Sequence, residues 1–119
     1  MAERRMISKK IVCTDKFLSL SDKSKIAYFY LLMEADDDGF IGNVRAVMSM
    51  CGIGLKSLTP LIENDYLLWF NSGVAAIAHW RAQNRVPKDR YTPTIYIDEC
   101  SKLALDDNMK YEYLSSCAR

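Results

Sequence analysis

The sequence predicts one small α+β domain, mainly α-helical, in which three helices precede a β-hairpin. Apolar residues recur at helical spacing in three segments between residues 21 and 64. Two runs rich in β-forming residues follow, and the turn Asn71-Ser72-Gly73 separates them, as is typical of a hairpin. With 119 residues the chain is long enough to bury a core without disulfides or metals.

The first predicted helix covers residues 21–35. Ser21 is suited to accept a backbone N–H bond at its start, and Asp22 complements the positive end of the helix dipole. The helix should end at the Asp-Asp-Asp-Gly sequence of residues 36–39, where we expect a turn with Gly39 at positive φ. These carboxylates do not match a calcium-binding loop, because the ligands of such a loop alternate along the sequence and end in a distant Glu.

A minimal strand is predicted at residues 40–41, and a second helix at residues 44–50. Asn43 is expected to cap this helix, which should end at Cys51 and Gly52. A short glycine-containing turn then leads to the third helix, so that the second and third helices form a helix–turn–helix pair.

The third helix is predicted over residues 55–64, and Pro60 makes it irregular. If the helix begins at Leu55, Pro60 removes one interior hydrogen bond and kinks it. If Thr59 is the cap, Pro60 occupies the first position of a helix about five residues long. We expect a kinked or irregular start rather than a missing helix.

The predicted hairpin has strands at residues 66–70 and 74–80 and follows the third helix directly. This order of elements is that of a winged helix–turn–helix domain, in which the hairpin is the wing. We therefore predict one domain over residues 1–119, with its core at about residues 4–85 and a C-terminal extension at about 86–119.

Four further expectations concern the flanks of this core. Residues 4–8 predict a short strand or arm, and residues 9–17 a short amphipathic turn. In the extension, residues 94–105 predict an additional C-terminal helix, with apolar residues available for packing. Residues 109–114 fit either a strand or a tail that becomes ordered on a partner.

Composition excludes several classes of protein. Half of the residues are hydrophobic and about a quarter are charged, as in an ordinary globular domain. No apolar run approaches the roughly 18 residues that span a bilayer, and no apolar signal region follows the basic N-terminus. We therefore expect a cytoplasmic protein without membrane contact. Four widely spaced Cys and a single His do not form a zinc pattern, so neither a metal nor a cofactor is expected.

Catalytic patterns are also absent from the sequence. It contains no Gly-rich phosphate loop, no paired carboxylates for acid–base work and no nucleophile elbow. His79 lies between Ala78 and Trp80 without a Ser or Cys motif, which indicates a packing role. We expect that the protein is not an enzyme.

Charge is unevenly distributed along a chain whose net charge is +1. Residues 1–30 contain seven Lys and Arg against three acids, whereas residues 31–80 contain two against six. Residues 81–90 contain four against one, and residues 91–119 three against five. Two basic segments on a near-neutral chain indicate either a local surface for phosphate groups or solvated surface charge.

The candidate DNA-binding residues lie in two segments. A winged helix usually places its third helix in the major groove, and the exposed face of this one should present a cation and two hydroxyls. The segment after the hairpin combines cations for phosphates with amides that can read base edges, and Tyr91 beside it can stack on a base. The alternatives are a third helix that mainly packs and a solvated basic loop. The candidates are Lys56, Ser57 and Thr59 in the helix, and Arg81, Gln83, Asn84, Arg85, Lys88 and Arg90 in the later segment. Lys9 and Lys10 are weaker candidates of the same kind.

The chain resembles a known family in four stretches: ERRMISKKIV, TDKFLSLSDKSKIAYFYLLMEADDDGFIGN, FNSGVAAIAHW and NRVPKDRYTPTIY. They resemble the N-terminal domain of phage replisome organizers, the DnaD-like replication initiation proteins of phages and prophages in Gram-positive bacteria. The resemblance covers about residues 3–107, and its specific part is the combined order of ADDDGF, SGV-x-x-I-x-HW and KDRY-x-PT.

This resemblance implies a winged-helix fold, binding to double-stranded DNA at a replication origin, and recruitment of helicase-loading machinery. It also implies a homo-oligomer that associates through residues 4–8 and 94–105, and often a further C-terminal domain. The chain departs from the pattern at Pro60 and in its cation-poor third helix, so groove reading by that helix is in question. The alternative function is an oligomerisation or protein-docking module of the replisome with little DNA binding of its own.

Overall fold

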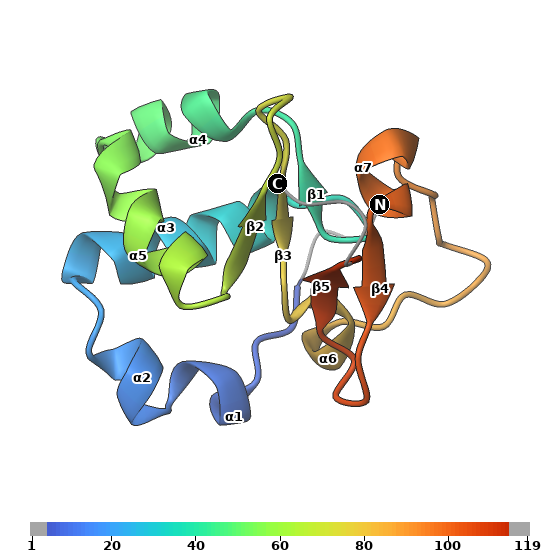
Figure 1. Ribbon diagram of the computed structural model, residues 1–119, viewed down its shortest axis with the longest axis horizontal. Helices are drawn as coiled ribbons and strands as arrows, with labels where there is room; N and C mark the ends of the chain where they lie inside the picture. The colour runs from blue at the N-terminus through green and yellow to red at the C-terminus, as the bar shows by residue number, and fades with distance from the viewer. Residues whose placement is uncertain (1–4, 115–119) are drawn as a thin grey trace.

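The longest helix, α3 (Asp22–Glu34), crosses the middle of the computed structural model, which describes residues 5–114 (Figure 1). Its start is as predicted, because the Ser21 hydroxyl accepts a hydrogen bond from the Ser24 backbone N–H at 3.2 Å. Its buried side packs against the second and third helical segments. After it, Gly39 adopts a φ of 91°, which confirms the predicted turn.

The second helix, α4 (Val44–Cys51), ends at Gly52, which has the left-handed conformation typical of a helix end. Asn43 is the N-cap residue of α4, as predicted, although its side chain is used elsewhere. The Asn43 side chain makes no capping bond and donates instead to Glu34 Oε1 at 3.3 Å, because the chain turns back at this point beside the end of α3.

The third helix has the irregular start that Pro60 predicts. A 3₁₀ turn, η1 (Leu55–Leu58), leads into the short helix α5 (Thr59–Glu63). Pro60 lies in the first turn of α5, where a missing N–H costs little because that group has no intrahelical partner there.

Three short strands form an antiparallel sheet in the order β1-β3-β2: β1 (Phe40–Ile41), β2 (Leu67–Trp69) and β3 (Ala75–Ile77). Ala76 lies opposite Phe40 on one side and Leu68 on the other. The hairpin is confirmed, although its second strand is shorter than predicted. Trp80 does not extend β3 but begins the short helix α6 (Trp80–Gln83).

The extension differs from its prediction. Only Ile97–Ser101 is helical (α7), and Leu103–Leu105 forms strand β4 instead of the end of a helix. β4 pairs with β5 (Tyr111–Tyr113), so the strand alternative for residues 109–114 is confirmed. Residues near 94 are not helical because the Thr94 backbone N–H is bound by the carboxylate of Asp38 and the Thr94 hydroxyl by that of Asp36.

The N-terminal segment forms two short helices, α1 (Lys9–Val12) and α2 (Asp15–Leu18), in place of the single predicted turn. Residues 5–8 form an arm without strand pairing, and Arg4 lies outside the described residues. Phe17 of α2 enters the core, where its ring packs edge-on against Tyr28 and Tyr66, at 5.2 Å between centroids in each case.

The described fold is thus an α+β arrangement, mainly helical, with two small antiparallel sheets. Trp80 is its largest fully buried side chain, and the sheet and α3 both contribute residues to the core around it. Within residues 5–114, no helix is both long and apolar enough to cross a membrane.

Two glycines test how closely the turn after α3 is packed. Gly39 and Gly73 have nearly the same φ, 91° and 89°, so alanine at either position costs roughly 1–2 kcal/mol of backbone strain. A Cβ at Gly39 would also lie 2.5 Å from Trp80 Cγ, whereas a Cβ at Gly73 meets nothing within 4 Å. We expect Gly39→Ala to lower the unfolding free energy by about 1–3 kcal/mol more than Gly73→Ala does, measured by urea denaturation. Equal losses would contradict this packing.

Candidate nucleic-acid interface

The acidic turn at residues 36–38 is the centre of the polar interactions that position the candidate site. Asp36 stabilises the turn itself, because its Oδ1 accepts the backbone N–H groups of Asp38 and Phe40 at 2.9 and 3.0 Å. Its other oxygen accepts the Thr94 hydroxyl at 2.5 Å. One carboxylate therefore shapes the turn and also attaches it to the C-terminal extension.

Asp37 is fully buried and attaches the N-terminal arm. Its carboxylate accepts from Arg5 Nη1 at 3.2 Å and from the Thr92 backbone N–H at 2.9 Å. The other terminal nitrogen of Arg5 donates to the Ala35 carbonyl at 2.7 Å, and the guanidinium lies over the Trp80 ring at 5.1 Å. The Trp80 indole N–H in turn donates to the Asp37 carbonyl at 2.9 Å.

Asp38 attaches α6, the loop that follows it, and β5. It forms an ion pair with Arg81, and its carboxylate accepts the Tyr91 hydroxyl at 2.7 Å and the Thr94 backbone N–H at 2.8 Å. The Tyr111 hydroxyl donates to the Asp38 carbonyl at 2.9 Å. Burial raises the pKa of Tyr111 to about 12, so this hydroxyl keeps its proton at neutral pH.

The two amides of the basic segment bind the arm rather than projecting into solvent. Both Gln83 and Asn84 are buried. Asn84 pairs with the backbone of Met6, accepting from its N–H at 2.7 Å and donating to its carbonyl at 3.1 Å. Gln83 accepts from the Ser8 backbone N–H at 3.0 Å and donates to the Tyr28 hydroxyl at 3.0 Å. In this structure neither amide is available to read a base.

Arg81, Gln83 and Asn84 therefore have their polar groups engaged within the protein. We leave these three residues out of the DNA-contacting surface that is proposed below. The earlier prediction that they contact DNA stays a prediction. Sequence reasoning missed this because the partners are distant, up to 78 residues away for Asn84. One signal was available in the sequence. Residues 31–80 contain six acids against two Lys and Arg, so their excess negative charge requires cations from elsewhere in the chain.

Three candidate cations remain exposed in the loop after α6: Arg85, Lys88 and Arg90. Within the described part of the chain, none of them forms an ion pair. We call residues 85–90 the basic loop. Asn84 holds its start to the arm and Tyr91 holds its end to Asp38, so a loop without regular structure is attached on both sides. In Figure 1 it projects at the right-hand edge of the molecule.

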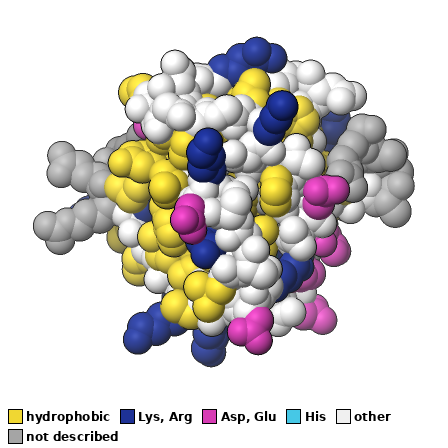
Figure 2. Space-filling view, turned by 90° about the vertical axis from the view of Figure 1, so that its left-hand side faces the viewer, with side chains coloured by type: hydrophobic (Ala, Val, Ile, Leu, Met, Phe, Trp, Pro, Cys, Tyr) yellow, Lys and Arg dark blue, Asp and Glu magenta, His cyan; other side chains and the backbone are white. Residues whose placement is uncertain are grey.

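The third-helix candidates lie on the other side. Lys56 and Thr59 are exposed, whereas Ser57 is half-buried and its carbonyl accepts the Ser24 hydroxyl at 2.7 Å. η1 and α5 are at the left of Figure 1, opposite the basic loop. Figure 2, which views the molecule from that left-hand side, shows dispersed basic side chains among hydrophobic and acidic ones. The structure does not bring the two groups of candidates together.

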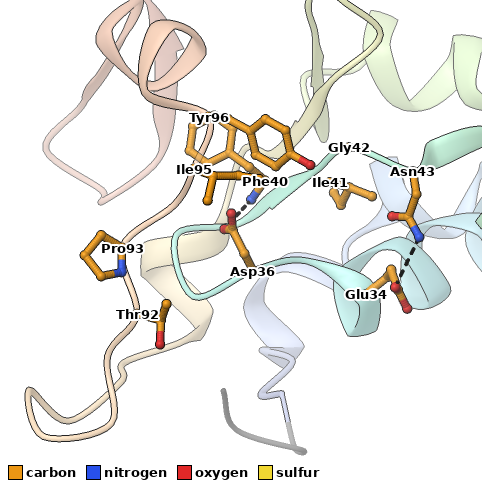
Figure 3. Close-up of a pocket in the computed structure, with 10 residues that line it drawn as sticks. All are labelled: Glu34, Asp36, Phe40, Ile41, Gly42, Asn43, Thr92, Pro93, Ile95 and Tyr96. Atoms are coloured by element: carbon orange, nitrogen blue, oxygen red, sulfur yellow. Dashed lines mark hydrogen bonds between the residues drawn. The ribbon is translucent and has the colours of Figure 1, made fainter.

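A shallow pocket of about 260 Å³ lies beside the acidic turn, between the start of α4 and residues 92–96 (Figure 3). Phe40, Ile41 and Ile95 give it an apolar lining, and its carboxylates are already hydrogen-bonded, Glu34 to Asn43 and Asp36 to the Phe40 N–H. Gly42 is required at its edge, because a Cβ there would overlap the Tyr96 hydroxyl. The lining suits an apolar side chain.

Residues 5–114 contain no group of three His, Cys, Asp or Glu side chains that could hold a metal ion. Comparison of the chain with protein-family models, with curated proteins and with solved structures finds no match in any of the three. The function is therefore argued from the residues and their geometry.

His79 precedes α6 and packs against the Tyr66 ring at 5.6 Å between centroids. Its Nδ1 is buried and has no hydrogen-bond partner in the described structure. Burial lowers the pKa of His79 from 6.5 to about 4, and the positive charges of Lys110 and Lys16 act in the same direction. The neutral imidazole is thus the form that the fold accommodates.

This lowered pKa predicts a pH dependence of stability. The folded state binds the proton more weakly than the unfolded chain, so the stabilisation is fully present above pH 6.5 and is lost as the pH falls towards about 4. The chain has one His, so a decline between pH 6.5 and about 5, above the usual carboxylate range, belongs to His79. Urea denaturation should show this decline in the wild type and a level profile in His79→Phe. A level wild-type profile would contradict the assignment.

The ion pair of Arg5 with Asp37 predicts strong energetic coupling, because both side chains are buried. Removing one partner leaves the other charge uncompensated, at a cost of about 3–5 kcal/mol. We expect Arg5→Met and Asp37→Asn each to lower the unfolding free energy by this order. The double variant should lose about 1–3 kcal/mol less than the sum of the two. Strict additivity in denaturant titrations would show that the pair does not act as a unit.

Proposed function

We propose that this chain is a winged-helix domain that binds duplex DNA through the basic loop, as part of a replication initiation protein. The order of its elements supports the winged-helix assignment: helix α3, strand β1, helix α4, the η1–α5 segment, then the hairpin of β2 and β3. β1 pairs with β3, so the three strands form one small sheet beside the three helical segments. The hairpin of residues 67–77 is the wing in this assignment.

The observation that supports DNA binding is that the cations of the basic loop are exposed and form no ion pair among the described residues. Arg85, Lys88 and Arg90 are exposed and have no acidic partner among the described residues, while both ends of the loop are attached to the buried turn and the arm. Lys and Arg in this state suit phosphate contacts, which supply most of the affinity of DNA binding. Attachment at both ends lowers the conformational entropy that the loop loses on binding.

The third helix has a minor role in this proposal. Lys56 is its single cation, and Glu63 ends α5 with negative charge. Because η1 and the basic loop lie on opposite sides of the molecule (Figure 1), one straight duplex contacts one of them and not both. We assign the phosphate contacts to the basic loop.

The biological setting in this proposal rests on the family resemblance. It adds a replication origin as the DNA, the helicase-loading machinery as a protein partner, and the cytoplasm of a bacterial host as the location. The alternative, a docking module with little DNA binding, is favoured by one observation: Ile95 and Ile97 beside the basic loop are 80% and 72% exposed. Such side chains suit a protein surface better than a phosphate backbone.

A comparison of two double variants tests the proposal. Arg85→Ala/Arg90→Ala removes two exposed cations from the basic loop, and Arg45→Ala/Lys56→Ala removes two exposed cations from the α4–η1 side. In mobility-shift titrations with duplex DNA at several salt concentrations, the first variant should lose affinity and lower the slope of log K against log salt by about 1.8. The second should bind like the wild type.

Each other outcome rejects a defined part of the proposal. A larger loss in Arg45→Ala/Lys56→Ala would move the contacts to the helix–turn–helix side. Absence of wild-type binding at a salt concentration of about 50 mM would reject DNA binding and leave the docking module.

A further inference from the structure

The pocket of about 260 Å³ in Figure 3, which we call the turn pocket, has walls that are fixed by the acidic turn. One wall comes from the end of α3 and the start of α4, and the other comes from the extension. Asp36 joins the two walls by accepting the Thr94 hydroxyl, and Asp38 accepts the Thr94 backbone N–H. Gly42 lets the Tyr96 side chain lie directly against the backbone of the first wall. The pocket is therefore preformed.

The charged side chains that line the turn pocket are both acidic, Glu34 and Asp36. Asp36 receives hydrogen bonds but no cation, and exposed Glu34 receives one bond of 3.3 Å from the Asn43 amide. Neither carboxylate forms an ion pair among the described residues. Arg45 and Arg90 each lie two positions from a lining residue in the sequence, but neither lines the pocket. The mouth of the pocket therefore favours a positive group.

The rest of the lining is mainly apolar. Phe40 and Ile41 are buried, whereas Ile95 at the rim is 80% exposed. Sites for small molecules usually enclose about 300–1,000 Å³ and surround most of the ligand. The turn pocket is smaller and shallow, so it suits one apolar side chain of a larger molecule, as in the anchor pockets of protein interfaces.

The backbone around the pocket is not available to pair with an added strand. β1 lies at the edge of its sheet, but the Phe40 carbonyl accepts the Asp36 backbone N–H at 2.9 Å and the Phe40 N–H is bound by the Asp36 carboxylate. On the opposite wall, Pro93 has no N–H to donate. Recognition must therefore come from side chains.

We propose that the turn pocket binds a segment of a partner protein that inserts one apolar side chain and places a neighbouring Lys or Arg at Glu34. Duplex DNA and anionic lipid surfaces do not fit, because their phosphates would approach the two carboxylates of the lining. The pocket shares no residue with the basic loop, so this inference stands independently of the proposed function. It specifies the chemistry of a protein partner, which the exposed isoleucines alone do not.

A short peptide isolates this recognition. The probe is the capped tripeptide acetyl-Arg-Leu-Arg amide, added to the full ¹⁵N-labelled chain and followed by NMR. The backbone signals of residues 40–42 and 95–96 should shift and saturate with a Kd of the order of a few mM, because one anchor and one ion pair give little affinity. Acetyl-Glu-Leu-Glu amide, with the opposite charge, and acetyl-Arg-Ser-Arg amide, without the anchor, should each bind at least about fivefold more weakly.

Variants of exposed residues test the two contacts separately. Glu34→Gln should weaken the Arg-containing peptide at least about threefold and leave acetyl-Gln-Leu-Gln amide unchanged, while Glu112→Gln, at an exposed carboxylate on β5, should bind like the wild type. Ile95→Ser should weaken every peptide that contains Leu. Ile97→Ser is its matched control, since Ile97 is also exposed but does not line the pocket. The spectrum of each variant shows whether the fold is intact.

Three results would overturn the inference. One is the absence of saturating shifts at the pocket with about 20 mM acetyl-Arg-Leu-Arg amide. Another is equal binding of the Arg-containing and Glu-containing peptides, since the carboxylates would then have no part in recognition. The third is a shift of the pocket signals with the concentration of the protein alone, because a second copy of this chain would then be the occupant.

Discussion

The structure depends on a turn that places three adjacent carboxylates at the end of α3, two of them on buried residues. A buried carboxylate is costly unless it is paired and hydrogen-bonded, and here the partners come from segments that are distant in the sequence. Arg5 comes from the arm, Arg81 from α6, and Thr92 and Thr94 from the extension. The requirement to neutralise one turn therefore holds three distant segments against the core: the arm, α6 and the extension.

This arrangement changes the meaning of the charge pattern. Arg5 and Arg81 belong to the two basic segments, yet they serve as counter-ions inside the fold. The cations that remain in the basic loop are those without such a task. The same turn that uses two of the cations also anchors the loop that presents the others, through the Tyr91 hydroxyl. Stability of the turn and geometry of the proposed DNA surface are thus linked.

Local signals predicted the fold well, and long-range ones were not visible in the sequence. The Ser21 cap, the turn at Gly39, the irregular start at Pro60 and the hairpin turn each depend on a few adjacent residues, and the structure confirms all of them. The helix predicted over residues 94–105 was mostly wrong because Thr94 is bound by Asp36, 58 residues away. The roles of Gln83 and Asn84 were missed for the same reason. Nothing near them in the sequence distinguishes an amide that binds the arm from one that reads a base.

Function is best sought in the groups that the fold leaves unsatisfied. The buried turn accounts for its own charges, so the exposed cations of the basic loop, which form no ion pair among the described residues, remain. Three cations make few phosphate contacts, so we expect the proposed DNA surface to bind a single site weakly at physiological salt.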